Sequence, residues 1–201
     1  MSPIFTKPNV LVLGGAGFLG SHLCDEMLKH NKVICLDNFI SGSETNIDHL
    51  MANRDFEFIR HDITTPIDLE TMPSLERFKI KFQGIQEVWH LACPTSPKDF
   101  EEQTMEILAA NSTGTINALE IAKRYNAKFL FTSSSVVYGP RRDDNLFLKE
   151  SDLGTVDFLS PRACYDEGKR FAEAICVTYQ KKYQFPVKIA RIFRAYGPRM
   201  P

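Results

Sequence analysis

The sequence has no excess of charge of either sign and no long apolar run. With 24 lysines and arginines against 25 aspartates and glutamates, the formal net charge is -1, so the chain lacks the basic surface typical of nucleic-acid or membrane-surface binding. No apolar run approaches the roughly 18 residues of a membrane-spanning helix, and residues 1–7 contain no signal-peptide core. We therefore expect a cytoplasmic protein that binds a small molecule, with neither nucleic acid nor a membrane as partner.

Signatures of disulfide, metal and hydrolase sites are also absent. The five cysteines are odd in number and form no Cys-x-x-Cys, which is typical of reduced thiols rather than of a disulfide framework. The five histidines show no metal-ligand spacing with each other or with the cysteines, so no metal site is predicted. No serine lies in a Gly-x-Ser-x-Gly elbow, and no Gly-Lys-Ser/Thr follows the N-terminal glycines, which argues against a serine hydrolase and a P-loop nucleotidase.

Buried strands and helices alternate along the chain instead. Short apolar runs predict strands, and longer amphipathic segments predict helices. The strands are expected at 9–13, 32–36, 56–60, 87–92, 128–132 and 187–193, and the helices at 18–30, 104–125 and 162–183. This alternation over 201 residues predicts one α/β domain spanning 1–201. Its fold is a Rossmann-type doubly wound parallel sheet with helices on both faces and strand order 3-2-1-4-5-6.

A glycine-rich turn joins the first predicted strand to the first helix. Gly14 permits a tight turn, Gly17 lets the backbone approach a pyrophosphate, and Gly20 lets the helix pack close to the strand. The helix N-terminus then favours the anion. Asp37 closes the second strand, where its carboxylate would accept hydrogen bonds from the adenosine ribose and repel a 2′-phosphate. The pattern predicts an NAD site; the alternative is an ordinary turn.

Tyr165 and Lys169 lie four residues apart on the last predicted helix and therefore share a face. A phenol with a pKa of about 10 needs that pKa lowered by about three units to act as a base near neutral pH. A cation about 4 Å away supplies roughly the required 4 kcal/mol, so Lys169 is expected to lower the pKa of Tyr165. The serine-rich end of the fifth strand offers a hydroxyl, Ser134, to hydrogen-bond the substrate oxygen. The alternative is a surface tyrosine–lysine pair beside a polar strand end.

These residues, with Asp37-Asn38-Phe39, His61-Asp62-Ile63 and the segment 191–200, resemble the extended short-chain dehydrogenase/reductase family of nucleotide-sugar enzymes, the NAD-dependent epimerases and dehydratases. Within that family, the segments 90–97 (HLACPTSP) and 164–170 (CYDEGKR) are most similar to the UDP-glucuronate decarboxylases. The resemblance covers nearly the whole chain.

The resemblance implies that NAD is reduced and reoxidised while UDP-glucuronate becomes UDP-xylose through a 4-keto intermediate. Tyr165 would take the proton of the sugar 4-hydroxyl, with Ser134 and Lys169 completing the catalytic set. Lys169 would also hold the nicotinamide ribose, and the enzyme would be a homodimer. The remaining implied cofactor contacts are Phe18, Leu19, Asn38, Phe39, Ser41, Gly42, Asp62, Ile63, Leu91, Ala92 and Pro94.

The chain departs from the family pattern at several places. Val136 stands where decarboxylating and dehydrating relatives carry an acid, and Arg194-Ala195 replaces a usual Asn-Thr. The segment 71–82 is expected to be an added surface helix or loop. The family's smaller C-terminal substrate domain is expected to be missing, because the sequence stops at Pro201. A 4-epimerase, a reductase or a 4,6-dehydratase therefore remains an alternative activity, as does cofactor binding without turnover.

Overall fold

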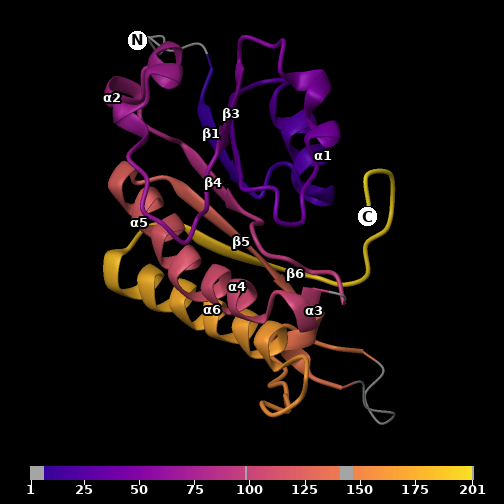
Figure 1. Ribbon diagram of the computed structural model, residues 1–201. Coiled ribbons are helices and arrows are strands. Elements are labelled where there is room, and N and C mark those ends of the chain that lie inside the picture. The colour runs from indigo at the N-terminus through magenta and orange to yellow at the C-terminus, as the bar shows by residue number, and fades with distance from the viewer. Residues whose placement is uncertain (1–6, 98, 141–146, 201) are drawn as a thin grey trace.

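One parallel sheet of six strands organises the molecule. The structure is a computed structural model that describes residues 7–97, 99–140 and 147–200. The strand order is β3-β2-β1-β4-β5-β6, which confirms the predicted doubly wound topology (Figure 1). The strands are β1 (Asn9–Leu13), β2 (Lys32–Asp37), β3 (Phe56–Arg60), β4 (Glu87–His90), β5 (Lys128–Ser134) and β6 (Val187–Ile192). Because all six run in parallel, their carboxyl ends meet at one edge.

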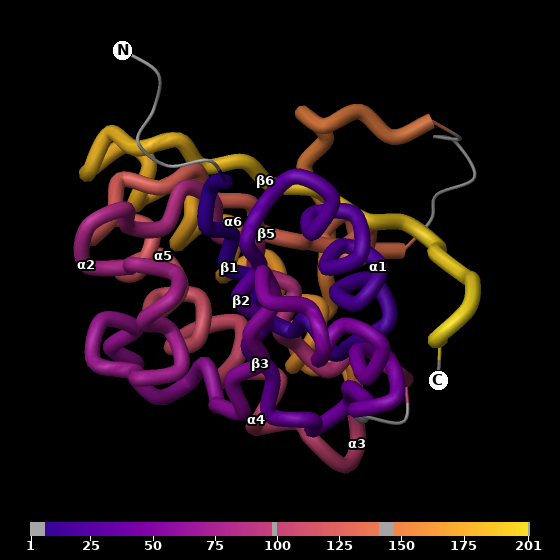
Figure 2. The backbone as a smooth tube through the Cα atoms, turned by 90° about the horizontal axis from the view of Figure 1, so that it is seen from above, coloured from indigo at the N-terminus to yellow at the C-terminus, as the bar shows by residue number. Residues whose placement is uncertain are grey.

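Helices cover both faces of this sheet, which is why its strands read as unbroken apolar runs. Helix α1 (Phe18–Met27) packs on β1 and β2, whereas α5 (Thr115–Tyr125) and α6 (Ala163–Tyr183) cover β4, β5 and β6. Figure 2 shows the strands stacked between α1 on one side and α2 and α5 on the other. Alternate residues of β1 enter the two cores: Val10 and Val12 face α1, and Leu11 and Leu13 face the other layer.

The long helix expected at 104–125 contains a change of helical form. Helix α4 (Thr104–Ala109) passes into a π-helical turn, η5 (Ala110–Gly114), before α5 begins. Within this stretch the Thr115 hydroxyl donates to the carbonyl of Ala110 at 3.2 Å, and the Asn111 amide donates to Ile107 at 2.9 Å. A wider turn of this kind inserts one residue, and it occurs frequently at functional sites. Within the described residues, no helix has the length and apolar character needed to cross a membrane.

The segment 71–82 is not the surface addition that the sequence suggested. It lies within a run of short helical turns, η3 (Leu69–Thr71), η4 (Pro73–Phe78) and α2 (Ile80–Gln83), so the helical part of the expectation is confirmed. The expectation that it lies only on the surface is wrong, because Leu75, Phe78 and Ile80 are buried in the core shared with α5. The Asn9 amide also donates to the Phe78 and Gly84 carbonyls at 2.9 and 2.8 Å.

After β6 the chain returns across α1. The carbonyl of Pro198 lies 3.0 Å from Nε2 of His22, and Arg199 forms an ion pair with Asp25 at 2.7 Å. The yellow C-terminal segment in Figure 1 follows this path. It brings residues 192–196 to the carboxyl edge of the sheet, beside the glycine-rich turn.

Candidate active site

The glycine-rich turn lies between β1 and α1 and is held close to β4. Gly14 has φ +79°, and a Cβ there would lie 2.6 Å from the backbone nitrogen of Ala92. A Cβ on Gly20 would lie 2.1 Å from the carbonyl oxygen of Gly14. Side chains at these two positions would force strand and helix apart. At Gly17 the nearest atom to a Cβ would be the Gly14 oxygen at 3.4 Å, so a ligand can approach the backbone here.

Asp37, the last residue of β2, holds this turn in place through hydrogen bonds from the backbone. Its Oδ2 accepts a hydrogen bond from the Ala16 backbone at 2.9 Å, and its Oδ1 accepts one from the Phe39 backbone at 2.8 Å. Burial raises the pKa of this carboxyl above its usual range, and the backbone donors partly oppose that effect. A carboxylate has about four acceptor sites, so the backbone donors of Ala16, Phe39 and Asn38 do not use all of them.

One large cavity, of about 910 Å³, runs along the carboxyl edge of the sheet. Its size lies in the range typical of sites for cofactors and small molecules. The sequence-predicted residues that line it are Gly14, Gly17, Phe18, Leu19, Gly20, Asp37, Asn38, Ser41, Asp62, Ile63, Leu91, Ala92, Pro94, Ser134, Tyr165 and Lys169. The fold thus brings the two predicted constellations, far apart in sequence, to one site.

Two other predicted cofactor contacts, Phe39 and Gly42, do not line this cavity. The Phe39 ring stacks on Phe58 with ring centroids 4.9 Å apart, and its backbone has φ +64°. Such a conformation is costly for an aromatic residue, and the hydrogen bond to Asp37 and the ring stack help to hold it. A Cβ on Gly42 would lie 3.0–3.1 Å from the Ala16 backbone and from Oδ1 of Asp37. Both residues therefore support the turn around Asp37.

Tyr165, Ser134 and Lys169 meet where α6 crosses the end of β5. The Ser134 hydroxyl is close enough to the Tyr165 phenol to lower its pKa, and the Tyr165 ring stacks on Phe100 with centroids 4.8 Å apart. Ser134 Oγ also accepts from the backbone of Val136 at 3.4 Å. The Lys169 ammonium donates to the Thr132 carbonyl at 2.9 Å and lies 5.8 Å from the Tyr165 ring centroid.

The structure corrects the expected effect of Lys169 on Tyr165. Burial raises the pKa of Tyr165 to about 12, against lowering influences from the Ser134 hydrogen bond and the Arg162 charge. Burial also lowers the pKa of Lys169. The expectation that Lys169 by itself lowers the pKa of the phenol is therefore wrong, because the ammonium is directed at a β5 carbonyl rather than at the phenol oxygen.

His90 lies under this site and was not singled out by the sequence. Burial and the nearby Lys169 charge lower the pKa of His90 to about 3, so its ring is neutral and adds no second cation beside Lys169. Its Nε2 lies 3.2 Å from the Thr115 hydroxyl. The only sequence signal for this contact is the position of His90 at the end of a strand, and Thr115 is distant in sequence.

Charged side chains are distributed unevenly along the cavity. The carboxylates Asp37 and Asp62 lie at the ends of β2 and β3, and Glu106 lines the cavity from α4. Arg162 and Arg194 line it beside α6 and β6. Arg162 sits over the Phe100 ring at 5.2 Å and pairs with Asp166 at 3.5 Å. The sequence analysis did not identify Arg162 or Phe100 as part of the site. For Arg162, the available signal was a basic residue one turn before Tyr165.

Val136 also lines the cavity. Its side chain packs against the small apolar cluster formed by Phe100, Ile107 and Tyr165. The position at which the family resemblance implies an acid is therefore part of an apolar wall beside Tyr165. The Val136 side chain cannot donate or accept a proton.

The glycine-rich turn, the acidic end of β2 and the cavity at the strand ends together define a dinucleotide-binding α/β protein. The family "NAD dependent epimerase/dehydratase family" matches residues 10–201, and the chain belongs to that family. UDP-glucuronic acid decarboxylase 1 of Arabidopsis thaliana is 42% identical over 192 residues, which are 95% of this chain and 40% of the relative.

Solved structures of two bacterial proteins are similar to this fold. UDP-glucuronic acid 4-epimerase from Bacillus cereus, in complex with NAD, aligns with TM-score 0.74 at 34% identity, covering 95% of this chain and 58% of the other. dTDP-glucose 4,6-dehydratase from Bacillus anthracis, also with NAD, aligns with TM-score 0.75 at 28% identity, covering 96% and 57%. The chain thus spans roughly half the length of the proteins it matches.

The cavity fits the family's cofactor, NAD. Gly17 leaves room for a pyrophosphate at the N-terminus of α1, and Asp37 retains acceptor sites for ribose hydroxyls at the end of β2. The buried carboxylate disfavours a 2′-phosphate at the same place. Lys169 and Tyr165 line the far end of the same cavity.

Asp37→Asn should weaken NAD binding about tenfold and reduce the preference for NAD over NADP, because a charge-assisted hydrogen bond is worth about 1.5–3 kcal/mol. Titrations of both cofactors followed by the fluorescence of Trp89, two residues before the cavity-lining Leu91, would measure this. Asp48→Asn, at an exposed carboxylate, is the matched control. An unchanged NAD to NADP affinity ratio in Asp37→Asn would contradict the assigned role.

Tyr165→Phe should make the chain less sensitive to alkaline unfolding. The phenol titrates near 10 in the unfolded chain and near 12 in the folded one, so between these pH values only the folded chain retains the proton, and stability falls as pH rises. Between pH 10 and 12, the free energy of unfolding of the variant should fall by up to about 2 kcal/mol less than that of the wild type. Tyr125, whose pKa burial also raises to about 12, leaves a residual slope.

Urea unfolding at several pH values between 9.5 and 11.5 measures this difference. Tyr196→Phe is the control, because the Tyr196 side chain is 90% exposed. Equal pH slopes for wild type and Tyr165→Phe would show that burial does not hold the proton on Tyr165.

Proposed function

We propose that this chain carries the cofactor-binding and catalytic residues of an NAD-dependent nucleotide-sugar enzyme that decarboxylates UDP-glucuronate to UDP-xylose. One observation carries the proposal: Tyr165, Ser134 and the buried Lys169 line the same cavity as the glycine-rich turn and Asp37. The similarity to a UDP-glucuronic acid decarboxylase over 95% of the chain supports the choice of reaction.

In this proposal Tyr165 takes the proton of the sugar 4-hydroxyl while Ser134 hydrogen-bonds the same oxygen. NAD held in this cavity would supply the hydride acceptor and donor for the chemistry at C4. The 4-ketone makes the neighbouring carboxylate a β-keto acid, whose carbon–carbon bond breaks to release carbon dioxide. The resulting enolate takes up a proton, and reduction of the ketone restores the 4-hydroxyl with the proton returned from Tyr165.

Tyr165 must be ionised to act as this base, and two neighbouring polar groups favour that form. The Arg162 charge and the Ser134 hydrogen bond already lower its pKa against burial. The stack on Phe100 fixes the ring, so the phenol oxygen keeps its position as the proton moves. Lys169, fixed on Thr132, lines the cavity on the same face of α6.

The basic end of the cavity supports an anionic sugar. Arg162 and Arg194 both line the cavity, Arg162 beside Tyr165, and a guanidinium pairs well with a carboxylate or a phosphate. Val136 argues against a 4,6-dehydratase, because the elimination of water needs proton transfer and valine provides none. A 4-epimerase acting on the same uronic sugar is the second candidate, supported by the likeness to the Bacillus cereus enzyme and by its need for Ser134, Tyr165 and Lys169 alone.

Incubation of the protein, at the full length that its gene encodes, with NAD and UDP-glucuronate should give a UDP-pentose and carbon dioxide, detected by mass spectrometry. Tyr165→Phe should abolish product and leave NAD affinity within about twofold, since the phenol acts on the sugar. An isomer of unchanged mass would favour the epimerase. NAD binding without product from any nucleotide sugar would favour a cofactor-binding protein without turnover.

We also propose that two copies of the chain associate through the helical layer. Apolar side chains are exposed along it, with Phe171 at 56%, Leu108 at 40% and Ile116 and Val177 at 38% each. These residues lie on α4, α5 and α6, which pack side by side. A second copy can cover them symmetrically, as in most homodimers.

Sedimentation velocity should show a dimer for the wild type and a shift toward monomer for Phe171→Ser. The substitution replaces an apolar ring in the interface by a small polar side chain. Phe82→Ser, at a side chain 83% exposed on α2, is the matched control and should stay dimeric. A monomeric wild type would overturn this assignment.

A further inference from the structure

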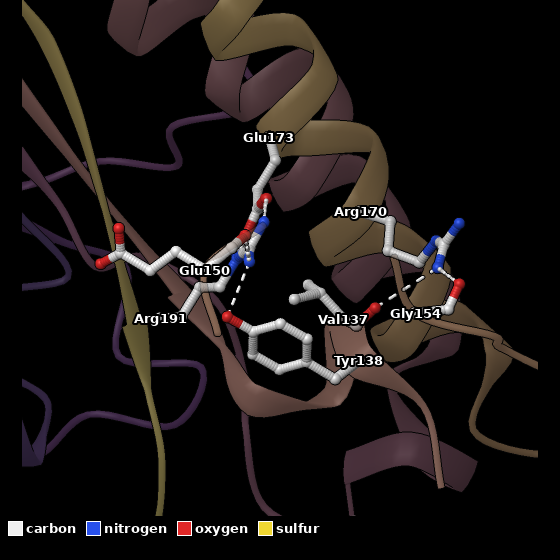
Figure 3. Close-up of polar contacts among 7 residues, drawn as sticks. All are labelled: Val137, Tyr138, Glu150, Gly154, Arg170, Glu173 and Arg191. Atoms are coloured by element: carbon white, nitrogen blue, oxygen red, sulfur yellow. Dashed lines mark hydrogen bonds and ion pairs between the residues drawn. The ribbon is translucent and has the colours of Figure 1, made fainter. Parts of the chain in front are cut away.

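A second polar network joins α6, β6 and the turn that follows β5 (Figure 3). Arg191 of β6 donates Nε to Oε1 of Glu173 at 2.9 Å and Nη2 to Oε2 at 2.8 Å, a bidentate pair. Its Nη1 donates to the Tyr138 hydroxyl at 2.8 Å and to the Glu150 carbonyl at 2.9 Å. The guanidinium also lies over the Tyr138 ring, 4.8 Å from its centroid.

Tyr138 belongs to the short helix η6 (Ser135–Tyr138), which begins directly after Ser134. Ser134 is the N-cap of η6, and its hydroxyl accepts from the Val136 backbone. Arg170 supports η6 from α6, donating to the Val137 carbonyl at 3.3 Å and to the Gly154 carbonyl at 2.9 Å. Arg170 and Arg191 thus fix the orientation of η6. They thereby also fix the Val136 backbone N–H, which donates to the Ser134 hydroxyl.

These contacts form a closed path that starts and ends on α6. It runs from Glu173 through Arg191 and Tyr138 to η6, then from the Val136 backbone to Ser134, and from Ser134 to Tyr165. Both charged members are largely buried, with side chains 25% and 14% exposed. A bidentate pair in such surroundings holds a more defined geometry than a surface ion pair.

From this path we infer that Glu173, Arg191 and Tyr138 are positioning residues: they set the orientation of Ser134 toward Tyr165, and through it the rate of the proton-transfer step. The inference rests on the proposed function for its catalytic consequence. None of the three residues lines the cavity, so they act on the reaction only through η6 and α6. A hydroxyl misdirected by a fraction of an ångström would slow the reaction without weakening substrate binding.

Tyr138→Phe tests the link with the least disturbance, because it removes one hydroxyl and keeps the ring that Arg191 covers. In the full-length enzyme we expect kcat to fall about tenfold while KM and NAD affinity stay within twofold. Ser134→Ala removes the end of the path, so adding Tyr138→Phe to it should cause no further loss. Additive losses, or a fall in stability alone, would overturn the inference.

Tyr179→Phe is the matched control. Tyr179 lies on α6, and its hydroxyl donates to a glutamate, Glu120, at 2.8 Å, away from the described cavity. This variant should leave kcat unchanged. An equal loss of kcat in Tyr138→Phe and Tyr179→Phe would overturn the inference, because a hydroxyl outside the path would then have the same effect.

A second readout separates this inference from the proposed reaction. The chain has six tyrosines, and labelling them with carbon-13 at the ring Cζ gives a resonance for Tyr165 that Tyr165→Phe identifies. Tyr138→Phe should move that resonance in the same direction as Ser134→Ala, even when no sugar is turned over. A Tyr165 resonance that responds to Ser134→Ala and not to Tyr138→Phe would overturn the positioning role and leave the proposed function standing.

Discussion

The burial of Lys169 against the end of β5 is the contact on which the candidate site depends. Removing an ammonium from water costs several kcal/mol unless fixed partners replace the solvent. Here the Thr132 carbonyl accepts from it at 2.9 Å, and the Phe131 ring lies 4.8 Å away. Because these partners belong to β5, the charge is stabilised only when α6 is docked in one register on that strand.

The register of α6 on β5 also determines which parts of the sheet the other residues on the same face of α6 contact. Residues four apart on a helix share a face, so Tyr165, Lys169 and Glu173 meet three successive features of the sheet: the Ser134 hydroxyl, the Thr132 carbonyl and Arg191, the cross-strand neighbour of Ser133. A single helix face thus holds a candidate base, a buried cation and an ion pair. The neutral His90 below adds no competing charge.

The other end of the cavity is built independently, on β1 and β2. Asp37 holds the glycine-rich turn with both carboxylate oxygens while its remaining lone pairs stay available. The parallel sheet connects the two ends, because every strand delivers its carboxyl end to the same edge. The resulting cavity is lined by Asp37 and Asp62 near β2 and β3 and by Arg162 and Arg194 near α6 and β6, and the arginines suit an anionic sugar bound beside a dinucleotide.

The order of the strands, the glycine-rich turn, the position of Asp37 and the Tyr165–Lys169 pair could be predicted from the sequence alone. These features depend on local periodicity and on chemistry within a few residues, which a single chain displays directly. Four results required the three-dimensional structure. Phe78 enters the core, and Phe39 supports the turn instead of lining the cavity. Burial raises the pKa of Tyr165, and Arg191 links Glu173 to Tyr138. Each of these results depends on how much water is excluded and on which distant segment lies adjacent, and neither is encoded by the spacing of residues along the chain.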